Sequence, residues 1–128
     1  MSVGNRSRIT EMLEEFHSAL NDPVGRGNCG LRYVLTVEEN KELEHELRFP
    51  SDIFIKRELL AQELCDVIYI AFGTAHAFAI DLDVGMEEIH RAAMSKLGPN
   101  KVVRPDGKIL KPKGFIPPDM TLSLTRES

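Results

Sequence analysis

The chain has few of the features that mark a secreted, membrane-spanning or thiolate-metal protein. Its two cysteines, Cys29 and Cys65, stand far apart and form no CxxC pair, which argues against a disulfide framework and a thiolate zinc site. The most apolar stretch, residues 67–80, contains polar residues and a glycine and is too short to cross a bilayer. The first ten residues have no apolar segment of the secretory kind. These absences predict a cytoplasmic protein with no membrane partner.

The composition is that of an ordinary globular protein. The 128 residues are 42% apolar and 28% charged, which predicts one domain over residues 1–128. The net charge of −4 is unevenly spread: residues 38–88 hold 13 acidic and 4 basic side chains, whereas residues 91–113 hold 7 basic and 1 acidic. An acidic middle and a basic segment suit a metal-bound polyphosphate better than polymeric nucleic acid.

Apolar residues recur at three- and four-residue steps, which is typical of helices with one buried face. The predicted helices span about residues 9–20, 31–47, 53–79 and 84–97. Asp22-Pro23 and Phe49-Pro50 are expected to end the first two. Ser51 or Asp52 is expected to cap the third helix and Asp83 the fourth. The sequence therefore predicts an all-α four-helix bundle, with a helical core of about residues 7–97 and the third, most apolar helix at its centre.

A proline-rich basic arm follows, at about residues 98–120. Five of the seven prolines lie between residues 99 and 118, so this segment is not expected to be helical. Residues 102–104 and 108–110 flank a Pro105-Asp106-Gly107 turn and could form a small β-hairpin. The polar residues 121–128 are expected to be frayed.

Residues 25–30 match the GxGxxG pattern of dinucleotide-binding loops. That loop must leave a β-strand, whereas this string follows a helical pattern and an Asp-Pro breaker. The interpretation favoured here is a loop between two helices.

Acidic residues carry the strongest functional signal. Five glutamates lie between residues 38 and 46, with like charges at four-residue separation that destabilise a helix unless something compensates them. Glu39 and Glu42 project from one face of the second predicted helix, and Glu63 and Asp66 repeat that spacing within an apolar run of the third. If the two helices are antiparallel neighbours, four carboxylates converge on a site suited to Mg²⁺. The alternative is a solvated acidic face.

Residues 31–43 and 63–69 carry EExxE and ExxD patterns that resemble the signature of the MazG-like all-α nucleoside triphosphate pyrophosphohydrolases. The similarity extends over roughly residues 15–120 and includes stretches similar to a branch that contains MazG-like dUTP pyrophosphatases. It implies Mg²⁺-dependent cleavage of a (d)NTP into (d)NMP and pyrophosphate, with Mn²⁺ as a substitute ion. It also implies a role in nucleotide-pool sanitation and assembly as a homodimer or a dimer of dimers.

The resemblance also implies roles for single residues. Glu39, Glu42, Glu63 and Asp66 would be metal ligands, and Glu38 would be the general base for the attacking water. The chain departs from the branch at Ala93, where Asn is usual, and at Ala79, where Gly is frequent. The first departure removes one polar group from the expected nucleotide site.

Attack of water on an α-phosphoryl group requires an activated nucleophile and neutralisation of the developing charge, which carboxylate-held metal ions can supply. Four cations could then hold the phosphates, with a solvated basic surface as the alternative. These are Lys96, Arg104, Lys108 and Lys111. Phe16 and His17 could line the base pocket, although a core Phe beside a surface His explains them equally well.

Two other functions remain open. Glu42 and His45, and again Glu87 and His90, form ExxH pairs of the kind found in di-iron carboxylate bundles, but that interpretation leaves Asp66 unexplained. A non-catalytic helical interaction module, with solvated acidic faces, is the other alternative.

Overall fold

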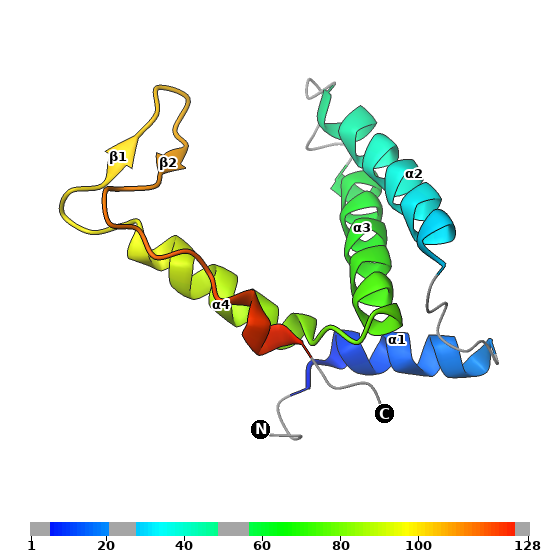
Figure 1. Ribbon diagram of the computed structural model, residues 1–128. Helices are drawn as coiled ribbons and strands as arrows, with labels where there is room; N and C mark the ends of the chain where they lie inside the picture. Colours follow the sequence, from blue (N-terminus) through cyan, green and yellow to red (C-terminus); the bar gives the residue numbers. More distant parts are fainter. Residues whose placement is uncertain (1–5, 21–27, 49–56, 125–128) are drawn as a thin grey trace. The chain divides into compact units, whose positions relative to one another are not determined.

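The computed structural model describes residues 6–20, 28–48 and 57–124 (Figure 1). Within these ranges the chain is mostly α-helical, as predicted, with one small antiparallel sheet. The elements are α1 (Arg8–Ala19), α2 (Cys29–Arg48), α3 (Arg57–Ala77), α4 (Leu82–Ser95), β1 (Val102–Val103), β2 (Ile109–Leu110) and the 3₁₀ helix η3 (Met120–Ser123). These elements form two compact units, residues 1–80 and residues 81–128. The prediction of one domain stays a prediction.

Several predicted signals lie outside the described residues. These are Asp22-Pro23, Phe49-Pro50, Ser51, Asp52 and the first three residues, 25–27, of the GxGxxG string. Among the helices that are described, none has the length and apolar character needed to cross a membrane.

In the first unit, α2 and α3 lie side by side and α1 packs against α3 (Figure 1). The Ser7 hydroxyl caps α1 by accepting a hydrogen bond from the Thr10 backbone N–H at 3.1 Å. The Asn28 side chain accepts one from the Leu31 N–H, at 3.2 Å, at the start of α2. Leu13 of α1 is the largest fully buried side chain and anchors this packing.

Helix α3 is less enclosed than its apolar sequence predicts. Leu64 and Ile68 are each 44% exposed, whereas the buried residues of α3 are the small ones near its end. These are Gly73, Ala75 and Ala77. Small side chains let two helices approach closely, so α1 packs against the C-terminal half of α3, where these residues lie.

Helix α3 ends at Ala77, two residues earlier than predicted. Ala79 has a φ of 56°, in the left-handed region, and the Ile80 N–H donates to the Ala75 carbonyl at 2.9 Å. This is the arrangement of a Schellman cap, in which glycine is the favoured left-handed residue. The backbone thus accounts for the glycine that is frequent at this position in the branch that the sequence resembles.

The second unit begins at an N-cap that the sequence analysis assigned to the wrong aspartate. Asp81, with extended backbone, accepts a hydrogen bond from the Val84 N–H at 3.2 Å, so it caps α4 in place of Asp83. Asp83 lies within the first turn, where its negative charge still complements the positive end of the helix.

The hairpin predicted in the arm is present. Val102 pairs with Leu110 and Val103 with Ile109 in antiparallel register. Gly107 has a φ of 97°, which the turn requires and which glycine adopts without steric cost.

The end of the described chain is held on α4 rather than frayed. The Asp119 N–H donates to Glu88 Oε1 at 2.9 Å, and Arg91 Nη2 donates to the Pro117 carbonyl at 3.2 Å. The Asp119 N–H and the Arg91 guanidinium hold the pKa of Glu88 below its usual value. Ser123 of η3 is buried, so the prediction of fraying is wrong for residues 121–124.

We predict that Ala79→Gly stabilises the protein, because an L-residue in the left-handed region costs roughly 1–2 kcal/mol, of which the flexibility of glycine in the unfolded chain offsets about 0.5–1 kcal/mol. Ala71→Gly, at an exposed position inside α3, is the control and should destabilise by about 1 kcal/mol. Urea unfolding measures both. A loss of stability in Ala79→Gly would show that the left-handed cap is not formed in solution.

Candidate metal centre

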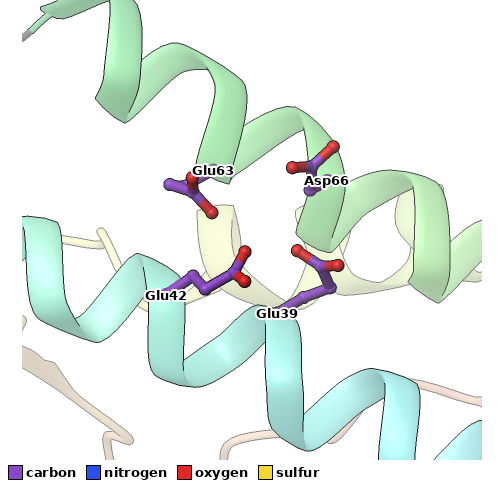
Figure 2. Close-up of side chains that lie close together, drawn as sticks. All are labelled: Glu39, Glu42, Glu63 and Asp66. Atoms are coloured by element: carbon purple, nitrogen blue, oxygen red, sulfur yellow. The ribbon is translucent and has the colours of Figure 1, made fainter.

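The four predicted metal ligands meet between α2 and α3. Glu39 and Glu42 lie one turn apart on α2, and Glu63 and Asp66 lie one turn apart on α3. Figure 2 shows their carboxylates turned toward one another in the space between the two helices. One carboxylate oxygen from each residue lies within 4.8 Å of the others. The pairing of α2 with α3 therefore brings together acids that are more than 20 residues apart in sequence.

Burial and mutual repulsion disfavour the ionised forms of two of these acids. Desolvation, and then the charges of Glu42 and Asp66, raise the pKa of Glu39. Desolvation, and then a side-chain hydrogen bond and charge repulsion from Glu42, raise the pKa of Glu63. A nearby positive charge would relieve both effects, because it favours the ionised carboxylate.

Two oxygens of the cluster have no partner within the described part of the chain. Glu39 Oε2 and Glu63 Oε2 are buried and accept no hydrogen bond. Buried polar atoms are normally satisfied, so each exception calls for an explanation. An all-oxygen set of four carboxylates is the donor set that hard divalent cations such as Mg²⁺ prefer. The donor set and the two unpartnered oxygens both fit such a cation.

Glu38 lies next to this cluster but is not one of its four members. Its side chain is exposed, and its charge contributes to raising the pKa of Glu39. The solvent-facing position beside the acids is compatible with a general base, and that role stays a prediction.

The histidines of the two ExxH pairs do not join the cluster. Within the residues that the structure describes, the close acidic group contains neither His45 nor His90. The arrangement of the carboxylates thus follows the EExxE and ExxD patterns and not the ExxH pattern.

Phe16 and His17, the predicted base-pocket residues, have different environments. Phe16 is 45% exposed and meets the Tyr69 ring edge-on, with a centroid distance of 5.7 Å. His17 is 3% exposed, and both its ring nitrogens have protein partners, at His76 and Arg32. Contact of a nucleotide with His17 would require these bonds to rearrange, so the arrangement favours Phe16 for the predicted role.

The predicted phosphate-binding cations belong to the second unit. They are Lys96, Arg104, Lys108 and Lys111. Arg104 makes a bidentate ion pair with Asp106, at 2.8 and 2.6 Å, which raises the pKa of Arg104. The Lys111 ammonium lies 5.8 Å from the centre of the Phe115 ring. Lys108 is exposed and Lys96 half-buried, and phosphate binding by all four stays a prediction.

A second polar group in the first unit, in which His17 joins Arg32 to His76, was not predicted from the sequence. Arg32 precedes Glu39 by seven residues and Gly73 follows Asp66 by seven, so both lie two helical turns, about 10 Å, further along the same seam. A Cβ added to Gly73 would lie 3.0 Å from Arg32 Nη1. The seven-residue spacing was the available signal.

We predict that Glu39→Gln raises the melting temperature of the protein when divalent cations are absent. The amide removes a buried negative charge from the cluster and can donate a hydrogen bond to a neighbouring carboxylate. Glu44→Gln, at an exposed position of α2 outside the cluster, should leave the melting temperature nearly unchanged. Thermal unfolding in a chelating buffer provides the comparison, and equal shifts in the two variants would mean that the four acids do not repel one another.

No curated protein matches the chain. The profile of a family described as phosphoribosyl-ATP pyrophosphohydrolase matches residues 5–93, a region that includes all four acids. That family lies in the MazG-like all-α superfamily, so the resemblance is confirmed at that level, while the dUTP pyrophosphatase branch stays a prediction. The chain belongs to the phosphoribosyl-ATP pyrophosphohydrolase family, whose members hydrolyse a phosphoanhydride.

Proposed function

We propose that this protein is a Mg²⁺-dependent hydrolase that cleaves the α–β phosphoanhydride of a nucleoside triphosphate and releases a nucleoside monophosphate and pyrophosphate. The observation that carries the proposal is the convergence of four carboxylates within 4.8 Å, two of them with buried oxygens that have no partner in the part of the chain that the structure describes. Family membership supports the reaction class.

In this proposal the cluster acts as the cation holder. Glu39 and Glu42 from α2, with Glu63 and Asp66 from α3, provide the oxygen ligands. Bound Mg²⁺ would neutralise charge on the phosphate oxygens and lower the pKa of coordinated water, and Mn²⁺ could replace it. The two helices hold the acids in place before substrate binds, which lowers the reorganisation needed for catalysis.

Glu38 is the proposed general base. It adjoins the cluster on α2, and its side chain is exposed, so a water molecule can reach it. As a base it would accept the proton of the water that attacks the α-phosphorus.

Two candidate substrates fit the proposed reaction. The first is a (d)NTP, including dUTP, as the resemblance of residues 31–43 and 63–69 implies. The second is phosphoribosyl-ATP, which the description of the matching family names. A pyrophosphate-release screen with Mg²⁺ over canonical and modified NTPs, dNTPs and phosphoribosyl-ATP would distinguish them. Absence of release from every one would refute the proposed function.

We predict that Glu42→Gln and Asp66→Asn each abolish pyrophosphate release, because a cation ligand serves both binding and catalysis. Glu38→Gln should lower kcat by about 10²–10⁴-fold while nucleotide still binds, because a base acts only in the chemical step. Glu44→Gln is the control on the same helix and should retain activity. Steady-state kinetics and nucleotide titration test these effects, and near-normal turnover in both ligand variants would exclude the cluster from the reaction.

The arm is proposed to bind the phosphates through its lysines. Lys108 and Lys111 are exposed, and the Lys111 ammonium lies over the Phe115 ring, whereas the Arg104 guanidinium is paired with the Asp106 carboxylate. We predict that Lys108→Ala and Lys111→Ala each weaken nucleotide binding by roughly 0.5–3 kcal/mol without weakening Mg²⁺ binding to the acids. Lys41→Ala, at an exposed position on α2, is the comparison. Isothermal titration would reject the proposal if both arm variants bound nucleotide like the parent protein.

A further inference from the structure

A chain of hydrogen bonds links the three helices of the first unit, away from the acidic cluster. Arg32 Nη2 of α2 lies 3.2 Å from His17 Nε2 of α1. The His17 Nδ1 lies 2.8 Å from the His76 Nδ1 of α3. The two imidazole rings have centroids 4.9 Å apart and lie in nearly parallel planes, 15° apart. His17 and His76 thus form a polar contact between α1 and α3, next to the buried Leu13.

The donors and acceptors of this chain determine which ring nitrogens carry protons. An arginine is always protonated and can only donate, so His17 Nε2 must be the acceptor. The proton of a neutral His17 then lies on Nδ1, which donates to His76 Nδ1. A neutral His76 therefore carries its own proton on Nε2. This series of hydrogen bonds from Arg32 through His17 to His76 therefore requires both imidazoles to be neutral.

A further proton on either ring breaks a bond. Protonated His17 would present an N–H to Arg32, and protonated His76 would present an N–H to the N–H of His17. The charges acting on His76 are also unfavourable to a cation, since they come from Arg6 before α1 and Arg32 of α2. Glu14 of α1 is paired with Arg6. The titratable Tyr69 of α3 meets this region through its edge contact with Phe16.

We propose that the His17–His76 pair is a proton-sensitive latch, which holds α1 on α3 while both rings are neutral and releases it when either ring binds a proton. The latch depends only on contacts within the first unit and does not rest on the proposed function.

The direction of the pH dependence follows from burial. Burial, and then Arg6 and Arg32, hold the pKa of His76 below the usual histidine value. A histidine in the unfolded chain therefore binds protons more readily than the folded one, and acid favours the unfolded or detached state. The contribution of the latch is complete above about pH 6.5, the ordinary histidine value. It decreases as the pH falls below that value, until the folded-state pKa is passed.

His76→Asn provides the test in the full-length chain. The Asn Oδ1 can take the place of His76 Nδ1 and accept the His17 hydrogen bond, but it does not titrate. Between about pH 7.5 and about pH 5.5, the melting temperature of the parent protein should fall by roughly 3–6 °C more than that of His76→Asn. His90→Asn, which removes an exposed histidine of α4, should follow the parent. The acidic cluster is common to all three proteins, so its own titration cancels in the comparison.

A second measurement does not depend on any variant folding. Nitrogen-15 NMR of the imidazoles at about pH 7.5 should find His17 protonated at Nδ1 and His76 at Nε2, the reverse of the common tautomer for His17. A His17 protonated at Nε2, or the same pH dependence of melting in the parent and in His76→Asn, would overturn the latch.

Discussion

Repulsion among four carboxylates between α2 and α3 is the constraint on which the account of this protein depends. Folding brings Glu39, Glu42, Glu63 and Asp66 together within 4.8 Å and leaves two of their oxygens buried without partners among residues 6–20, 28–48 and 57–124. Contacts outside the cluster must offset the free-energy cost of this repulsion. They include the packing of α1 on α3, where Leu13 and the small residues of α3 are buried. Four carboxylates that repel one another favour the binding of a cation, because its positive charge removes the repulsion among them.

Much of this site could be predicted from sequence because its signal is local. The Glu39/Glu42 and Glu63/Asp66 spacings each place two acids on one helical face, and antiparallel pairing is the common outcome for consecutive helices. The proposed roles of Glu38 as base and of the arm cations do not follow from helix spacing, because they depend on a reaction and on a bound ligand. The predicted homodimer or dimer of dimers depends in the same way on a second copy of the chain.

The features that sequence analysis missed depend on tertiary contacts or on backbone conformation. Arg32, His17 and His76 come from three helices. The seven-residue spacing of Arg32 from Glu39 places Arg32 on the same face of α2 but does not show which side chains of α1 and α3 it meets. The left-handed Ala79 shortened α3 at a position where alanine gives no hint of a cap. Both Asp81 and Asp83 suit an N-cap by residue type, and only the extended backbone at Asp81 decides between them. Apolar periodicity predicted the helix α3 correctly, but it did not predict that apolar side chains such as Leu64 and Ile68 would be exposed.

The most direct test of the central claim is paramagnetic broadening by Mn²⁺ in a nitrogen-15 NMR spectrum of the metal-free protein. Substoichiometric Mn²⁺ should broaden the amide signals of residues 39–42 and 63–66 most strongly, and excess Mg²⁺ should restore them. Strongest broadening at other residues of the described chain, or broadening that Mg²⁺ does not reverse, would contradict a Mg²⁺ site formed by these four acids.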